Sequence, residues 1–303
     1  MTEPEFSSYY GRAVIKPPVW KEDIAYYLFL GGLAAGSSVL AAGADQTGRP
    51  SLRRGTRLGA VGSIGLGTVF LIRDLGRPER FHHMLRVAKL TSPMSVGTWI
   101  LSAYAPLAGL AAASEVLPLR LRDAALGRLI SGAARPAGLA AAFMASGVAS
   151  YTGVLLADTA VPAWNEAKDV MPLIFVASAA ASAGGLGMIV APVSEAAPAR
   201  RLSQFGAVLE LAASRWLESR GERAIEPYRR GKAGRYLSRA SWLTAGGSLG
   251  SLLLARRSRL GAFLAGAALL AGGFYERLGI FEAGFESAKD PEYSAGSSQS
   301  ALP

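Results

Sequence analysis

Long runs of apolar, uncharged residues are the feature that most constrains how this chain folds. A bilayer core requires roughly 20 apolar residues, with tolerance down to about 17, so the shorter runs must borrow flanking residues. The runs are apolar all round, whereas helices of soluble proteins show an amphipathic 3.6-residue period. We therefore predict an all-α integral membrane protein with eight transmembrane helices: Ile24–Ala44, Leu58–Ile72, Leu90–Ser114, Pro136–Ala157, Val170–Ser194, Leu202–Ser214, Ala240–Ala255 and Leu260–Tyr275.

The composition supports this class and excludes several kinds of redox centre. Half of the residues are hydrophobic and 36 are glycine, and small residues let membrane helices approach closely. The chain has no cysteine, which excludes disulfides, thiolate metal sites and iron–sulfur clusters within it. Its two histidines, His82 and His83, are adjacent and would point about 100° apart on a helix, so they do not clamp a haem from two sides. We expect membrane lipid around the protein, with no haem, metal or nucleic acid bound to it.

The charge of the loops bears on orientation. An even number of spans places both termini on one side of the membrane, here called side A, opposite side B. The side-B loops (45–57, 115–135, 195–201 and 256–259) carry 13 Lys and Arg against 4 Asp and Glu, and the remaining residues include 19 against 18. Loops rich in Lys and Arg tend to lie in the cytoplasm, which is the positive-inside rule. The raw count of Lys and Arg favours side A as cytoplasmic. Short loops dominate this rule, however, and the density of Lys and Arg in the short loops favours side B. We therefore expect a multi-pass protein of the bacterial inner membrane with its termini outside the cytoplasm.

Four polar motifs punctuate the ends of the predicted spans. Arg73–Phe81 is a turn rich in charge, proline and glycine, and Thr91–Trp99 follows it. Ser150–Gly153 lies near the end of the fourth span, with Pro162–Asn165 shortly after. If the spans alternate in direction, all four motifs face side A, and we predict that they build one site there.

These motifs resemble those of the NrfD / polysulfide-reductase membrane-subunit family. The resemblance covers nearly the whole chain, including Tyr27–Gly36 in the first span and Phe281–Pro291 near the end. It implies an N-terminal interfacial segment (1–23), a first four-helix bundle with a quinone site (24–157), a second four-helix bundle (158–277) and a C-terminal tail (278–303). It also implies that menaquinone or ubiquinone binds near the face that docks a ferredoxin-like iron–sulfur subunit, which links to a molybdopterin catalytic subunit.

Two tyrosines are the predicted quinone-binding residues. Position alone makes Tyr151 a member of an interfacial aromatic belt, but it matches the quinone-contacting tyrosine of the family within Ser150–Gly153. A phenol donates a hydrogen bond to a quinone carbonyl while its ring lines an apolar pocket. Tyr27 lies near the start of the first span, where the family often has a polar ring, sometimes histidine. A protonatable imidazole is therefore missing at this position.

Two carboxylates are the predicted catalytic residues, because hydroquinone oxidation releases two protons with two electrons. Asp74, where the second span meets side A, either accepts such a proton or pairs with Arg73, Arg77 or Arg80 to hold the loop. Asp23 or its neighbour Glu22 either takes the proton in place of the missing imidazole or is a solvated residue at a helix start, where a carboxylate suits the helix dipole.

Two charged residues lie in or near the later spans. Glu210 interrupts the sixth and weakest apolar run, and a charge at bilayer depth usually faces protein or water. It either belongs to a proton path or, as we favour, pairs with Arg215 about one turn on. Arg277, at the end of the last span, is expected to snorkel to the interface.

Together these features favour the quinone-interacting membrane subunit of a respiratory, molybdopterin-type oxidoreductase complex, inactive alone. It would exchange electrons between the quinone pool and an iron–sulfur partner on side A, in a direction that the sequence leaves open. A small-solute transporter is the first alternative, although we find no inverted repeat of the kind transporters often show. A membrane anchor without quinone chemistry is the second. Bound quinone in the purified complex would separate the three.

Overall fold

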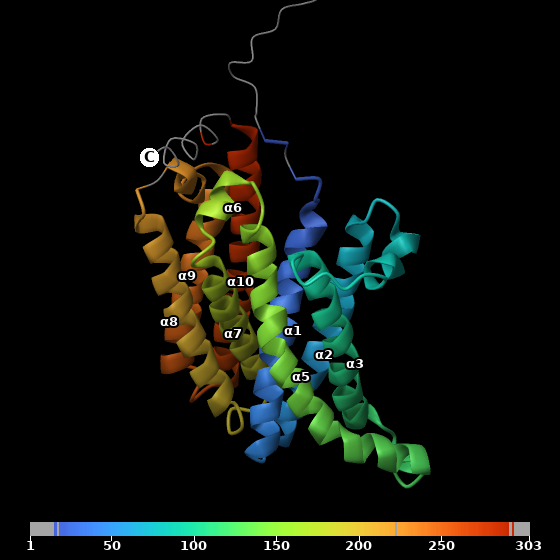
Figure 1. Ribbon diagram of the computed structural model, residues 1–303. Helices are drawn as coiled ribbons and strands as arrows, with labels where there is room; N and C mark the ends of the chain where they lie inside the picture. Colours follow the sequence, from blue (N-terminus) through green and yellow to red (C-terminus); the bar gives the residue numbers. More distant parts are fainter. Residues whose placement is uncertain (1–14, 17, 222, 291–292, 294–303) are drawn as a thin grey trace, which may run out of the picture.

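The protein folds into long helices that run side by side (Figure 1). The computed structural model describes residues 15–16, 18–221, 223–290 and 293, and this part contains no strand. Eight of its helices have 20 residues or more, and the remaining ones are short turns between them. In chain order they are α1 (Glu22–Gln46), α2 (Pro50–Asp74), η1 (Pro78–Leu85), α3 (Pro93–Val116), α4 (Leu119–Arg122), α5 (Ala125–Ala157), α6 (Pro162–Glu166), α7 (Met171–Val190), α8 (Ala197–Ser219), η2 (Arg223–Tyr228), α9 (Gly231–Leu253) and α10 (Arg259–Lys289).

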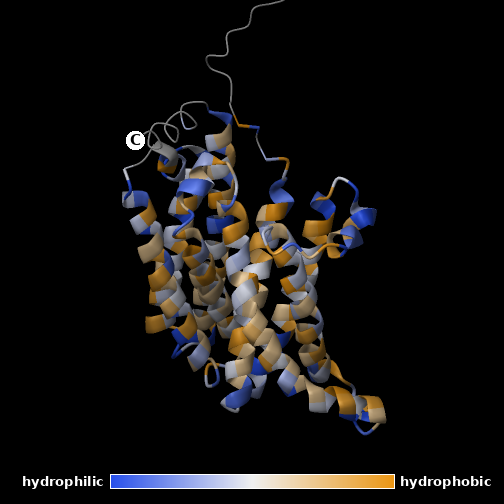
Figure 2. Ribbon diagram, viewed as in Figure 1, coloured by the Kyte–Doolittle hydropathy of each residue, from blue (hydrophilic) through white to orange (hydrophobic). Residues whose placement is uncertain are grey.

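Each predicted span corresponds to one long helix, and the class of all-helical membrane protein is confirmed. Within the part of the chain that the structure describes, six helices are long and apolar enough to cross a membrane: α1, α2, α3, α5, α7 and α10. Helices α8 and α9 run alongside them but are not among these six. Figure 2 shows apolar residues along the middle of the helices and polar residues gathered at both ends. The protein is thus a multi-pass membrane protein, and the count of eight spans stays a prediction.

Helix ends follow from local chemistry. Pro50 and Pro93 begin α2 and α3, where a proline loses no helical hydrogen bond. Gly48 has φ +66°, a conformation that glycine adopts without strain, in the turn between α1 and α2. Helix α10 continues to Lys289, so the expected tail from residue 278 is helical in its first part. Most of the polar stretch at 215–239 also belongs to helices, and most of the expected C-terminal tail after residue 290 lies outside the described residues.

The long helices pack in two groups that share a wide interface. Helices α1, α2, α3 and α5 contact one another, as do α7, α8, α9 and α10, and α1 also packs on α7. Small residues allow this approach: a Cβ added at Gly36 of α1 would lie 2.6 Å from the Ala179 carbonyl oxygen of α7. The predicted boundary between two separate bundles is not tested by this packing and stays a prediction.

An ionic network joins the side-B ends of the first group. Arg57 of α2, only 6 % exposed, pairs with Asp45 of α1 (3.4 Å) and with Glu115 of α3 (2.9 Å). Arg53 pairs with the same two carboxylates at 3.0 and 2.7 Å. These arginines from a predicted loop therefore hold helices together.

Two predictions about buried charges were wrong. Glu210 is 2 % exposed and accepts a hydrogen bond from the Thr244 hydroxyl of α9 (3.1 Å), rather than pairing with the exposed Arg215. Arg277 is also 2 % exposed and pairs with Glu276 at 2.7 Å, rather than reaching the interface. Position along one helix could not reveal this, because other helices bury both side chains, with Thr244 of α9 against Glu210 and Phe175 of α7 against Arg277.

Candidate functional site

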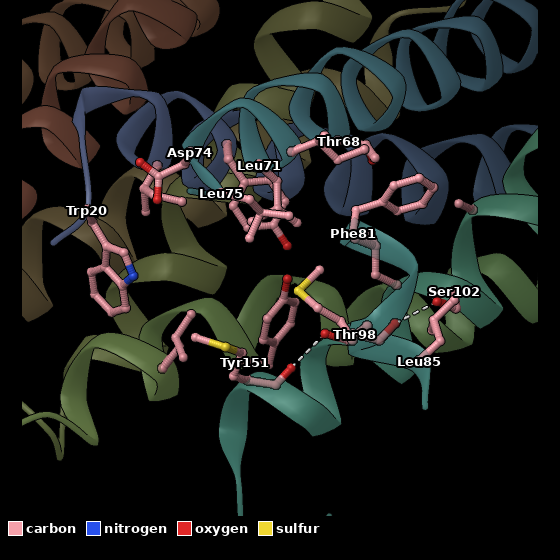
Figure 3. A pocket seen from close by; sticks show the side chains of 18 residues that line it. Trp20, Thr68, Leu71, Asp74, Leu75, Phe81, Leu85, Thr98, Ser102 and Tyr151 are labelled. Atoms are coloured by element: carbon pink, nitrogen blue, oxygen red, sulfur yellow. Dashed lines mark hydrogen bonds between the residues drawn. The ribbon is translucent and has the colours of Figure 1, made fainter. Parts of the chain in front are cut away.

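The side-A pocket is an apolar cavity at the ends of α1, α2, α3 and α5, partly covered by η1. Its volume is about 240 Å³, and residues from five segments and from the stretch before α1 line it. Figure 3 shows Trp20 and Asp74 at one end and Phe81, Leu85 and Ser102 towards the other. The polar side chains in its wall are few, which is the usual pattern of a small-molecule site: Tyr27, Thr68, Asp74, Thr98, Ser102 and Tyr151.

Three of these polar side chains already donate their hydroxyl hydrogen to a hydrogen bond within their own helix. The hydroxyls of Thr68, Thr98 and Ser102 each donate to the carbonyl oxygen four residues earlier in their own helix, at 2.8–2.9 Å. Such local bonds are common for hydroxyls inside helices. The remaining polar groups are the two tyrosines and the aspartate that the sequence predicted, and the structure brings these three together in one pocket.

Tyr27 presents a buried hydroxyl that finds no hydrogen-bond partner among the described residues. Its side chain is 2 % exposed and packs beside Gly67, at which an added Cβ would lie 3.5 Å from the ring. Buried polar groups in proteins nearly always have a partner, and an exception calls for an explanation. A ligand with an oxygen acceptor in the side-A pocket would supply the missing bond.

Asp74 lies at the C-terminal end of α2 and is held by the main chain. Its Oδ1 accepts a hydrogen bond from the Lys21 N–H (2.8 Å), and it has no ion pair among the described residues. The alternative in which arginines of the loop neutralise Asp74 is therefore absent from this structure. Arg73 instead reaches Asp23 at 3.7 Å. Asp23 does not line the pocket, and its catalytic role stays a prediction.

Tyr151 stands between two hollows. Its ring points into the side-A pocket from the side opposite Leu71 and Leu75 (Figure 3). It also lines an open groove of about 650 Å³ between α3, α5 and α7. Gly97 of α3 lies against the ring, and a Cβ at this position would overlap it. The motif Thr91–Trp99 therefore gives the tyrosine ring a flat surface to rest on.

Sequence reasoning missed some residues of the site. Trp20 lines the pocket and stacks on Trp164 of α6, with ring centroids 5.8 Å apart. Trp164 is fully buried and donates its indole N–H to the Ile280 carbonyl oxygen of α10 (2.7 Å). The fourth polar motif therefore lies behind the pocket wall rather than in it. A tryptophan just before a predicted span was the available signal for Trp20, whereas the part played by Gly97 depends on a contact between two helices.

The described residues of the side-A pocket do not form a set of metal ligands. The described residues contain no group of three or more histidine, cysteine, aspartate or glutamate side chains placed to hold a metal ion. His82 and His83 are exposed on η1 and do not line the pocket. The polar groups present are hydrogen-bond donors and a carboxylate, which suit an organic ligand with oxygen atoms.

Two comparisons with known proteins relate this geometry to a family. A family model described as polysulphide reductase, NrfD, matches residues 13–207, a range that includes every pocket residue. The protein is also 34% identical over 174 residues to the C subunit of polysulfide reductase from Wolinella succinogenes. That alignment covers 53% of this chain and 54% of the relative, so the match spans about half the length of the curated relative.

Proposed function

This chain belongs to the NrfD family, and from that premise we propose that it is the quinone-interacting membrane subunit of a respiratory oxidoreductase complex. One observation carries the proposal: Tyr27, Tyr151 and Asp74 line a single apolar pocket in which the Tyr27 hydroxyl has no partner among the described residues. A quinone fits this set, because its carbonyl oxygens accept hydrogen bonds and its ring is apolar. Menaquinone and ubiquinone share these features.

The residues of the pocket have separable tasks in this proposal. A bound quinone would supply the two-electron, two-proton chemistry. Tyr27 and Tyr151 donate hydrogen bonds that orient the ligand, and the apolar wall, with Ile24 and Leu101, excludes water. Asp74 receives or delivers a proton at Oδ2, because the Lys21 N–H occupies Oδ1. Asp23, which pairs with Arg73 at 3.7 Å outside the pocket, is the second proton acceptor of this proposal.

Electron transfer requires a partner, because this protein has no cysteine for a relay cluster. We assign this role to a ferredoxin-like iron–sulfur subunit, linked to a molybdopterin catalytic subunit. The partner must lie over the pocket, on side A. Crosslinking from Arg80 on η1 should capture it, whereas capture only from Arg128 on the opposite side would contradict the electron-transfer geometry.

The proposed orientation places side A outside the cytoplasm. Arg53 and Arg57 are ion-paired, so the positive charge that favours side B as cytoplasmic comes from side-B arginines without ion pairs in the described structure, such as Arg54, Arg128 and Arg256. A single cysteine introduced at Ser297 should react with an impermeant reagent in intact cells. Protection until lysis would reverse the orientation and leave the pocket unaffected.

The substitution Tyr27→Phe tests the pocket. It removes a hydroxyl that makes no hydrogen bond within the described structure, so the thermal stability of the quinone-free complex should stay equal or rise. Quinone affinity should fall by about 0.5–1.5 kcal/mol, or roughly 2- to 12-fold, for one lost bond. Tyr275→Phe in α10, away from the pocket, is the matched control. Unchanged affinity in Tyr27→Phe would remove this residue from the site.

The two alternative functions predict different outcomes. A small-solute transporter or a membrane anchor should purify without quinone, and neither should lose a quinone-coupled reaction when Tyr27 or Tyr151 is changed. The quinone content of the wild-type complex therefore tests all three functions at once.

A further inference from the structure

The buried glutamate cluster, formed by Glu210, Glu276 and Arg277, lies within the second group of helices. All three residues are about 2 % exposed. Arg277 donates to Glu276 Oε2 (2.7 Å) and to the Phe175 carbonyl oxygen of α7 (2.8 Å), and its guanidinium lies over the Phe175 ring. The cluster lies beyond the region that the family model matches and has no part in the proposed quinone chemistry.

The cluster contains two carboxyl groups and one guanidinium, and its hydrogen bonds are incomplete. Glu210 Oε1 accepts from the Thr244 hydroxyl (3.1 Å), but Glu210 Oε2 and Glu276 Oε1 find no partner among the described residues. Two ionised carboxylates beside one guanidinium would leave an uncompensated buried negative charge, which is very costly in a low-dielectric interior. One bound proton removes this charge.

A small cavity lies against the two carboxyl groups that each have one oxygen without a partner among the described residues. It measures about 20 Å³, enough for roughly one water molecule, and both Glu210 and Glu276 line it. Ser214 and Glu218 line it too, spaced four residues apart after Glu210 along one ridge of α8. Glu218 is partly exposed near the side-A end of α8. The cavity therefore extends from the buried glutamate cluster towards the side-A surface.

The other elements around the cluster add few titratable groups. Helix α7 contributes Ser178, and α9 contributes Ser241 and Thr244. The η2 segment contributes Tyr228, whose hydroxyl donates to the Ala163 carbonyl oxygen (3.0 Å) and whose pKa is raised by burial. Helix α1 faces Arg277 with Gly32. Among the described residues that line the cavity, the three glutamates are therefore the only carboxyl groups, and Arg215 and Arg229 are the charged groups near Glu218.

We propose that Glu210 and Glu276 share one exchangeable proton that communicates with side A through Glu218. The proton leaves a carboxyl O–H of the pair and adds to a water in the cavity. That water passes a proton to the Glu218 carboxylate, and no electrons move. This site is independent of the quinone proposal, because it requires neither the side-A pocket nor a partner subunit.

Infrared difference spectra of the full-length protein in its complex, after a pH step in H2O and in D2O, test the proposal. The wild-type protein should show a protonated carboxyl band that shifts in D2O. Glu210→Gln and Glu276→Gln each leave one carboxylate opposite Arg277, so the band should be lost in both. It should persist in Glu282→Gln, a change on the same helix away from the cavity.

The Glu218→Gln variant tests the route separately. It should keep the carboxyl band but slow its isotope shift relative to the wild type. The wild-type spectrum alone can overturn the proposal, whether or not the variants fold: no carboxyl band would mean that the cluster is fully ionised. A band that never shifts in D2O would mean that the proton is trapped. An isotope shift that is equally fast in Glu218→Gln would exclude this route.

Discussion

The side-A pocket and the buried glutamate cluster place polar groups inside a membrane protein in opposite ways. In the pocket, the polar groups, chiefly the uncharged side chains of Tyr27 and Tyr151, are spread over an apolar wall with empty space between them. In the cluster, Glu210, Glu276 and Arg277 are packed together almost without space. The first arrangement leaves room for a ligand, whereas the second leaves room for a proton and one water. The size of the space beside a polar group therefore indicates what it can bind.

The largest expected effect is a loss of stability when the cation of the buried glutamate cluster is removed. Arg277→Met removes the only cation of the cluster among the described residues, and losing one partner of a buried ion pair costs about 3–5 kcal/mol. Unfolding of the detergent-solubilised complex measures this loss, and Arg235→Met, at an exposed position of α9, should change stability by less than about 0.5 kcal/mol. A loss below about 1 kcal/mol for Arg277→Met would mean that the cluster neutralises itself by binding a second proton.

The second prediction concerns the surface on which Tyr151 rests. Gly97→Ala places a methyl group within the tyrosine ring, and overpacking of this kind costs about 1–3 kcal/mol. Because the ring must move, quinone binding should be lost as well. Gly109→Ala is a matched control on the same helix, since its Cβ would meet nothing within 4 Å. Normal quinone binding in Gly97→Ala would show that the position of the ring does not matter.

The third prediction compares two buried tyrosines of the first group. The Tyr104 hydroxyl donates to the Ala34 carbonyl oxygen (2.8 Å) and also bonds Ser38 Oγ (2.8 Å), whereas that of Tyr27 has no partner among the described residues. Tyr104→Phe should therefore cost about 0.5–1.5 kcal/mol of stability and leave quinone affinity unchanged. Tyr27→Phe should do the reverse. Equal effects of the two changes would contradict the assignment of Tyr27 to the ligand.

The smallest expected effect is at the side-B end, where Glu195 joins the two groups of helices. Burial raises the pKa of its carboxyl, but hydrogen bonds from the Leu52 N–H and from Ser51 outweigh this, so the net pKa is lowered. A lowered pKa contributes stability above the unfolded-state value of about 4.3, and this contribution is lost as the pH falls through the folded-state pKa.

Thermal unfolding at several pH values tests this contribution. Glu195→Gln should be less stable than the wild type at neutral pH, and the difference should shrink below about pH 4. Glu79→Gln, at an exposed position of η1, should show no such difference at any pH. A constant difference between Glu195→Gln and the wild type would mean that ionisation of Glu195 contributes nothing.

Much of the pocket could be predicted from the sequence because its polar residues lie near helix ends. Tyr27, Asp74 and Tyr151 stand near the ends of apolar runs whose directions alternate, so their common side follows from counting spans. The partners of Glu210 could not be predicted in this way, because Thr244 and Glu276 come from helices whose rotation is set by packing. Arg215 was the nearest charge along the sequence, but it points outwards.

The sequence by itself determined the helices, their approximate limits and the family, because apolar runs and short motifs are local properties. Only the tertiary structure decided which faces meet. It placed Gly97 under Tyr151, Trp20 on Trp164, and Arg277 against Phe175 inside the bundle. The physical reason is that a helix flanked by apolar neighbours has no preferred rotation of its own. Close packing of small residues such as Gly36, Gly185 and Gly266 fixes that rotation, and with it the partners of every buried polar group.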